Sequence, residues 1–161
     1  MSTATEMRAA VRAKEFEFPL SVEWLGGRRV AVKVEGKEAI EIAPPPVFQG
    51  TDPTAWSPED FLVAAAASCL AVTFTGLAER DGLGYRNLKV DGTGICGKRN
   101  DGHFGFTRLH LQFAVETSPI DEARARALAE KAESTCLVSA SLDLPVETAI
   151  THASALGRLR F

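Results

Sequence analysis

The chain has 161 residues, which is enough for one domain with one hydrophobic core and not comfortably enough for two. Its composition, 45% hydrophobic and 24% charged, is that of an ordinary soluble globular protein. The net charge of -3 gives no basic excess, and the mixed charges form no basic patch, which excludes a typical nucleic-acid-binding protein. We predict a single domain over residues 1–161, with residues 1–16 as a candidate flexible arm.

The N-terminal stretch and the apolar segments predict a protein of the cytoplasm. Residues 1–17 mix Glu, Arg and Lys with short apolar residues and lack the apolar central region of a signal peptide. The longest nearly apolar stretch, residues 61–78, is rich in Ala and holds Ser and Thr, whereas a membrane-spanning helix needs roughly 20 strongly apolar residues. We therefore expect a core helix there and no membrane partner.

The first part of the chain predicts a meander of three antiparallel strands. Alternating runs separated by glycine-containing turns cover residues 21–25, 28–35 and 39–43. In the second run Val30, Val32 and Val34 share one face, so that face is expected to lie on a core. Three consecutive prolines at positions 44–46 end the sheet, because proline has no N–H to donate to a neighbouring strand.

A long apolar helix is predicted over about residues 58–80, ending near Gly82. Ser57 is a good N-cap, Pro58 suits the first helical position and Asp60 lies in the first turn. The middle of this helix is apolar on all sides, and a helix of that kind lies inside a structure rather than on its surface. In a chain this small, complete burial is easiest if a second subunit covers the helix.

The second half of the chain predicts further strands and a second, amphipathic helix. The strands are expected over residues 87–97, 104–117 and 145–152, and the helix over residues 119–134. Cys136 directly follows this helix, and residues 137–142 are a candidate helical turn. Strands and helices are segregated rather than alternating singly, which predicts an α+β fold with antiparallel sheets.

Three cysteines, Cys69, Cys96 and Cys136, are the candidate reactive residues. Their odd, low number without a CxxC motif argues against a disulfide framework, and no histidine clusters with them, so we expect no metal and no cofactor. Plain packing is the simpler interpretation of Cys69, since free cysteine is among the most buried residue types. The spacing of Cys69 and Cys136 in the sequence neither predicts nor excludes a disulfide between them. A packing role and a redox role both stay open for the cysteines.

Glu59 and one of two adjacent arginines form a second candidate group. Glu59 suits a helix N-terminus, where a carboxylate is favourable, and Arg28 and Arg29 follow a turn, where solvated side chains are usual. Strand alternation turns one of the two arginines toward the core side. An inward arginine needs a partner, and the Glu59 carboxylate is the natural one.

Two segments of the chain together form a signature. The first reads Ser57-Pro-Glu-Asp-Phe-Leu-Val-Ala-Ala-Ala-Ala-Ser-Cys-Leu: a Pro-Glu pair, a run of small residues, and a cysteine ten residues after the glutamate. The second reads Ser134-Thr-Cys-Leu-Val-Ser. Together they resemble the OsmC/Ohr family (osmotically inducible protein C and organic hydroperoxide resistance protein), whose second motif usually has proline where this chain has Leu137. The resemblance extends from about residue 20 to the C-terminus through the order of the elements.

The resemblance implies an OsmC-like fold, an intertwined homodimer with antiparallel sheets around long central helices and an active site at the dimer interface. It also implies a cysteine-based peroxidase that reduces organic hydroperoxides, with hydrogen peroxide as a second candidate substrate. Cys69 would attack the peroxide and become a sulfenic acid, and Cys136 would condense with it to a disulfide. An external thiol reductant, lipoyl-type or another, would then restore both thiols. The alternative is a small-molecule-binding or stress-associated dimer without significant peroxidase activity.

The resemblance also assigns roles to the charged residues. The glutamate that matches Glu59 pairs with an arginine in the family, and the pair holds the reactive cysteine as a thiolate. Arg28, directly after a glycine pair, matches the Ohr branch, and Arg29 is the runner-up. A cysteine inside an apolar helix would otherwise stay protonated, because burial disfavours the charged form, so we expect a cation at Cys69. Cys96 has no counterpart in this scheme and is expected to be structural.

Overall fold

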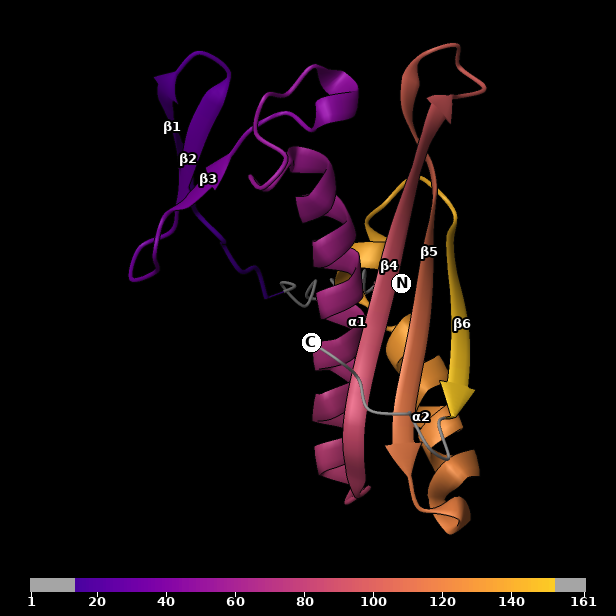
Figure 1. Cartoon of the computed structure of the whole chain (residues 1–161). Coiled ribbons are helices and arrows are strands. Elements are labelled where there is room, and N and C mark those ends of the chain that lie inside the picture. Colours follow the sequence, from indigo (N-terminus) through magenta and orange to yellow (C-terminus); the bar gives the residue numbers. More distant parts are fainter. Residues whose placement is uncertain (1–13, 153–161) are drawn as a thin grey trace, which may run out of the picture. The chain divides into compact units, whose positions relative to one another are not determined.

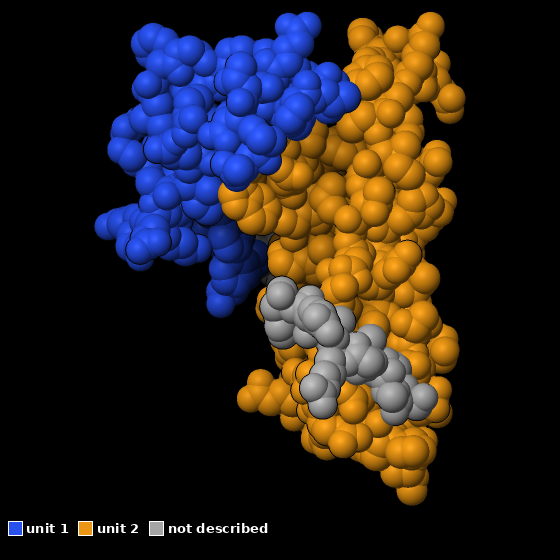
Figure 2. All heavy atoms as spheres, viewed as in Figure 1, with its two compact units in different colours: residues 1–55 blue, residues 56–161 orange. Residues whose placement is uncertain are grey.

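Residues 14–152 are described by a computed structural model, in which the chain divides into two units, residues 1–55 and residues 56–161 (Figure 2). Each unit is described by itself. The predicted arm over residues 1–16 lies almost wholly outside the described residues. The expectation of one domain over the whole chain stays a prediction.

The first unit contains a three-stranded sheet in the order β1-β2-β3 (Figure 1). Its strands are β1 (Ser21–Gly26), β2 (Arg29–Lys33) and β3 (Ile40–Ile42), and both pairs are antiparallel. Gly26 and Gly27 make the turn between β1 and β2 with φ of 110° and 56°, a left-handed backbone that glycine adopts without strain. The predicted meander is confirmed, and the chain leaves it through a 3₁₀ turn at Pro46–Phe48.

The apolar face of this sheet is only partly covered within the described chain. The cross-strand pairs Trp24–Val30 and Val30–Ile42 place apolar side chains on one face, yet Trp24 is 74% exposed. The buried residue of β2 is Ala31, on the opposite face between the charged partners Glu23 and Glu41. Ile42 on this face is 7% exposed and Val30, Val32 and Val34 are half-buried, so the described chain covers part of the face, and the expectation that it lies on a core stays a prediction.

The second unit packs helices against a sheet in the order β4-β5-β6 (Figure 1). Its elements are α1 (Pro58–Asp81), β4 (Tyr85–Lys98), β5 (Phe104–Thr117), α2 (Glu122–Ser134), α3 (Leu137–Ala140) and β6 (Val146–His152). The strands β4 and β5 are antiparallel, as expected, but β6 runs parallel to β5. The reason is that the helices between them carry the chain back to the end of the sheet at which β5 began, so β6 must run in the same direction. The α+β class is confirmed.

The start and end of α1 agree with the prediction. Ser57 is the N-cap, and its hydroxyl accepts from the Asp60 N–H while the Asp60 carboxylate accepts from the Ser57 N–H at 2.9 Å. This reciprocal capping box satisfies two N–H groups that the first turn of a helix leaves without acceptors. Gly82 ends the helix with φ of 68°.

The core of the second unit lies between one face of the sheet and the helices α1 and α2. Four alternating side chains of β5 share one face and are at most 1% exposed: Leu109, Leu111, Phe113 and Val115. Phe74 of α1 is fully buried and meets the Phe113 ring at a centroid distance of 4.9 Å. Gly94 of β4 allows close approach, because a Cβ atom there would lie 2.4 Å from the Phe106 ring and 2.8 Å from Val63 of α1.

The helix α1 is buried on one side only by the described chain. Its buried residues are Ala66, Leu70, Phe74, Leu77 and Ala78, whereas Val72 is 68% exposed. It has the length and composition of a membrane-spanning helix, as core helices of soluble proteins also can, and 28% of its most apolar window is buried. Complete burial was expected with a second subunit; one copy of the described chain packs on only one face of α1, and burial by a partner stays a prediction.

Candidate functional site

The structure brings Cys69 and Cys136 together within the second unit. Cys69 lies in the middle of α1 and is partly buried, and Cys136 is the residue directly before α3, 1% exposed. The Cys136 thiol is near enough to act on Cys69, whose pKa it helps to lower. Both cysteines are free, and a disulfide between them would need their Cα atoms within about 7 Å.

The sulfur of Cys69 accepts hydrogen bonds from four groups around it. Burial raises the pKa of this thiol, but hydrogen bonds from the Val138 N–H, the Cys136 thiol, the Thr73 hydroxyl and the Leu137 N–H together outweigh burial and leave the pKa below its ordinary value. Donors to a sulfur stabilise the thiolate over the thiol. All four of these groups are neutral. The cation that we expected at Cys69 is not among the described groups that lower its pKa.

Cys136 is itself held by a donor. The Ser139 hydroxyl donates to the sulfur of Cys136 at 3.2 Å, one helical turn away. Ser139 therefore positions the sulfur of Cys136, and the Cys136 thiol is one of the groups that lower the pKa of Cys69.

Glu59 lies in the first turn of α1 and is not brought to Cys69 of its own helix. Ten residues at the helical rise separate the two along the helix axis by about 15 Å. The Oε2 atom of Glu59 is buried and has no hydrogen-bond partner among the residues that the structure describes. An unpartnered buried carboxylate oxygen is unfavourable, and a cationic partner would stabilise it.

Cys96 of β4 lies near Glu59 instead of near the other cysteines. Burial raises the pKa of the Cys96 thiol, and the negative charge of Glu59 raises it further. A thiol of this kind stays protonated and is a poor nucleophile. The prediction that Cys96 is structural agrees with this environment.

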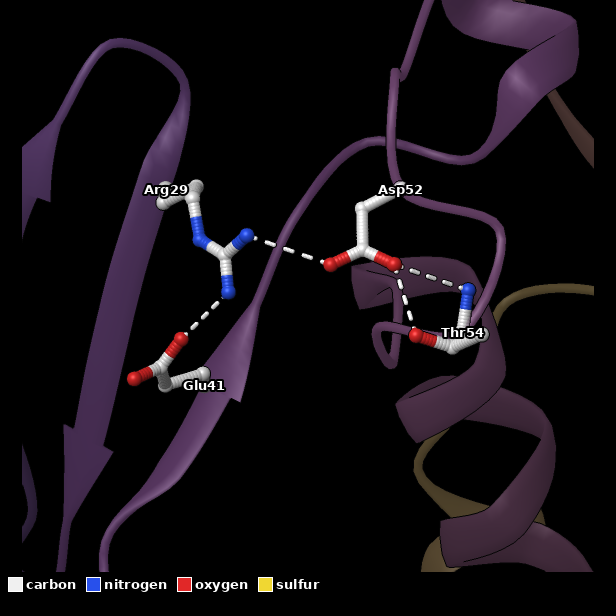
Figure 3. Close-up of polar contacts among 4 residues, drawn as sticks. All are labelled: Arg29, Glu41, Asp52 and Thr54. Carbon is white, nitrogen blue, oxygen red and sulfur yellow. Dashed lines mark hydrogen bonds and ion pairs between the residues drawn. The ribbon is translucent and has the colours of Figure 1, made fainter.

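Arg29 forms ion pairs with two carboxylates of its own unit, the first. It pairs with Glu41 at 2.5 Å and with Asp52 at 3.1 Å, and Asp52 also accepts from the hydroxyl and N–H of Thr54 (Figure 3). The hydrogen bond and charge of Glu41 raise the pKa of Arg29, whereas the two hydrogen bonds from Thr54 are the largest causes that lower the pKa of Asp52. The charge of Arg29 is therefore balanced within its own unit.

Arg28 has a different environment in the same unit. Its Nη1 atom donates to the backbone oxygens of Phe48 and Gln49 at 3.0 and 3.5 Å, and within residues 14–152 it takes part in no ion pair. Both arginines line a cavity of about 280 Å³ between the β1–β2 turn and residues 43–52. Within the described residues, no carboxylate pairs with the guanidinium of Arg28. An ion pair between Arg28 and Glu59 stays a prediction.

Several residues of the site were not predicted from the sequence. Thr73 follows Cys69 by four residues, a spacing that puts both on one face of a helix and could have identified it. Ser139 appeared only as the last residue of the second motif. The donors at Leu137 and Val138 are backbone N–H groups, for which a sequence contains no signal.

Comparison with known proteins agrees with this architecture. A family model described as OsmC-like protein matches residues 50–151. The uncharacterized protein YmaD of Bacillus subtilis is 28% identical over 147 residues, which are 89% of this chain and 97% of YmaD.

Solved structures share the fold at low sequence identity. An OsmC-like protein of unknown function from Vibrio cholerae superposes with a TM-score of 0.77 at 21% identity, over 85% of this chain and all of that one. An organic hydroperoxide resistance protein from Elizabethkingia anophelis gives 0.71 at 20% identity, over 87% of this chain and 99% of that one. The resemblance predicted from the two cysteine segments is confirmed, and the chain belongs to the OsmC-like family.

Proposed function

We propose that this protein is a thiol-dependent peroxidase that reduces organic hydroperoxides through Cys69 and Cys136. The observation that supports this most is that the Cys136 thiol is among the donors around Cys69, whose pKa they lower despite its burial. A thiolate is the nucleophile in peroxide reduction, and a second thiol beside it resolves the product. The shared fold with an organic hydroperoxide resistance protein supports the same activity.

The proposed reaction has three steps. The Cys69 thiolate attacks the outer oxygen of the hydroperoxide, the O–O bond breaks, and an alcohol leaves once its alkoxide takes a proton, with Cys69 oxidised to a sulfenic acid. The Cys136 sulfur then attacks the Cys69 sulfur and expels the hydroxyl group, which leaves as water with the proton of Cys136. An external thiol reductant finally supplies two electrons and two protons, which break the disulfide and restore both thiols.

A second copy of the chain is the proposed partner. The uncovered side of α1, with Val72 68% exposed, and the uncovered apolar face of β1, with Trp24 74% exposed, are surfaces that a monomer would leave in water. A homodimer that buries α1 against its symmetry mate would cover an apolar helix on both sides. The run of alanines at positions 64–67 would let two such helices approach closely.

The dimer also gives Glu59 its proposed role. Glu59 and Cys69 lie ten residues apart, so two antiparallel α1 helices that cross at residue 64 would place Glu59 opposite Cys69 of the partner subunit. The unpartnered Oε2 atom of Glu59 would then face an arginine beside that sulfur. Arg28 is the better candidate than Arg29, because two carboxylates already balance Arg29.

The proposed surroundings are those of the cytoplasm. A reducing compartment keeps the three cysteines free and supplies thiol reductants, lipoyl-type or other. Hydrogen peroxide stays a second candidate substrate. The apolar side chains around Cys69 favour peroxides with an organic group.

The experiment that tests the proposal is a thiol count with mass mapping after a stoichiometric dose of cumene hydroperoxide. We expect the loss of two thiols and a Cys69–Cys136 crosslink. The Cys96→Ser variant is the matched control and should consume peroxide at the unchanged rate, since the raised pKa of Cys96 keeps its thiol protonated and unreactive. The Cys136→Ser variant should instead stop at a Cys69 sulfenic acid that a dimedone probe captures.

The opposite result would support a different function on the same fold. Three free thiols after exposure, with the peroxide unconsumed, would exclude a peroxidase. The protein would then be a small-molecule-binding or stress-associated dimer.

A further inference from the structure

Cys136 is the less accessible of the two proposed reacting cysteines. It is 1% exposed and lies between α2 and α3, both of which pack against α1. Cys69 is only partly buried in the described chain. In the proposed function a peroxide must reach the Cys69 sulfur, and an opening that admits an organic hydroperoxide also admits a small thiol. The two sulfurs of the disulfide are therefore unequal targets for an external reductant.

The sulfur of Cys136 has a hydrogen-bond donor of its own. The Ser139 hydroxyl donates to the Sγ atom of Cys136 at 3.2 Å, and Ser139 is partly buried. Both cysteines are free in this structure, so this contact belongs to the state that reduction of the disulfide produces. A donor to sulfur stabilises a thiolate more than a thiol, so the contact favours Cys136 at the moment when it is released with a negative charge.

We propose that the external thiol attacks the sulfur of Cys69, and that Cys136 leaves as a thiolate which the Ser139 hydroxyl stabilises. This inference rests on the proposed peroxidase function and adds to it the order of bond exchange in the reductive step. It gives the two cysteines different fates, since Cys69 carries the reductant while Cys136 is released.

The reductive step then consists of two exchanges. The thiolate of the reductant forms a bond to the Cys69 sulfur, the Cys69–Cys136 bond breaks, and its electron pair goes to the sulfur of Cys136. A second thiolate, from the same dithiol or from another monothiol molecule, forms a bond to the reductant sulfur and releases Cys69 as a thiolate. The reductant gives up two electrons and becomes a disulfide, and the protons from its thiols are available to the two protein sulfurs.

Two effects oppose each other in the choice of sulfur. A thiol of lower pKa leaves faster, and the pKa of Cys69 lies below its ordinary value, so this effect favours attack at Cys136. Access favours attack at Cys69, because the incoming sulfur must come within bonding distance of its target. A residue that is 1% exposed leaves no room for that approach, and the hydrogen bond from Ser139 assists the departure of Cys136.

The test maps the first product of reduction in the Cys96→Ser chain, in which only the reacting pair carries thiols. Diamide, which is not a peroxide, oxidises the pair to a disulfide. Glutathione then attacks the disulfide, and acid stops the reaction before alkylation with N-ethylmaleimide. We expect glutathione on Cys69 and the maleimide on Cys136. Glutathione on Cys136, or on both cysteines in similar amounts, overturns the proposal and leaves the peroxidase function standing. Failure of diamide to form the disulfide contradicts both.

The role of Ser139 is tested by Ser139→Ala, with Ser141→Ala as the matched control. The Ser141 hydroxyl donates to the Leu137 carbonyl at 2.8 Å rather than to a sulfur. We expect Ser139→Ala to slow reduction of the disulfide by glutathione about two- to fivefold, the effect of losing one donor to a sulfur that gains charge, and Ser141→Ala to leave the rate unchanged. An unchanged rate in Ser139→Ala, or an equal loss in both variants, overturns the role of Ser139.

A merely structural role of Ser139 would have a different result. Loss of packing would also slow alkylation of Cys69 in the reduced chain, whereas loss of a donor to Cys136 should leave that rate unchanged. Ser139→Thr keeps the hydroxyl and should restore the rate of disulfide reduction. If Ser139→Ala does not fold, the mapping in the chain that keeps Ser139 still decides which sulfur the thiol attacks.

Discussion

Thr73→Val removes one hydroxyl donor from Cys69 and keeps the shape of the side chain. The Thr73 hydroxyl is hydrogen-bonded to the Cys69 sulfur one helical turn away. A hydrogen bond contributes about 1.5–3 kcal/mol to a charged acceptor and about 0.5–1.5 kcal/mol to a neutral one. The loss therefore disfavours the thiolate relative to the thiol by about 1 kcal/mol, which raises the pKa of Cys69 by roughly 0.7 units.

The sign of the pH dependence follows from this shift. The folded pKa of Cys69 lies below its ordinary value, so reactivity rises with pH through that low pKa and reaches a plateau above it. Thr73→Val moves the midpoint upward. Below both midpoints the variant should react about fivefold more slowly, and above both the rates should be equal.

The assay is the alkylation rate of Cys69 against pH, with peroxide consumption at the same pH values as a second readout. Thr75→Val is the matched control, since it makes the same change two residues along α1 and its hydroxyl donates only to the Val72 carbonyl, at 2.8 Å. Equal profiles for Thr73→Val and Thr75→Val would refute the view that neutral donors set the Cys69 pKa.

Two further predictions concern the strand that faces the start of α1. Gly94→Ala should destabilise the fold by about 1–3 kcal/mol, since a Cβ atom would lie 2.4 Å from the Phe106 ring. Urea unfolding measures this loss of stability. An unchanged unfolding midpoint would contradict the close approach. Glu59→Gln should lower the pKa of Cys96, because the Glu59 charge raises it, and alkylation of Cys96 near pH 8 should become faster than in the unaltered chain. A constant Cys96 rate would show that the carboxylate is too distant to act.

Local signals in the sequence determined most of the secondary structure. Ser57 and Asp60 specify the start of α1 through a capping box that involves only four consecutive residues. The alternation of β5 predicted its four buried side chains, because one face of that strand packs on helices and the other meets water. The parallel direction of β6 was missed, since direction depends on where the intervening helices carry the chain and not on the residues of the strand.

The candidate site divides in the same way. Two short motifs and a glycine pair in the sequence identified the four candidate residues Cys69, Cys136, Glu59 and Arg28. Their mutual arrangement did not follow, and Glu59 lies beside Cys96 rather than beside Cys69 of its own helix. The rise of an α-helix fixes the distance between two residues ten positions apart, whatever their side chains. Two residues of one motif on the same helix can therefore belong to different sites.

The sequence by itself determined the elements, their caps and the family. Those follow from interactions between residues close in the chain and from motifs of fixed spacing. Only the tertiary structure decided which groups act on Cys69, namely the Cys136 thiol, the Thr73 hydroxyl and the N–H groups of residues 137 and 138, which together lower its pKa. The physical reason is that a thiol pKa depends on burial and on donors within hydrogen-bond reach, and packing alone brings those donors from a distant part of the chain.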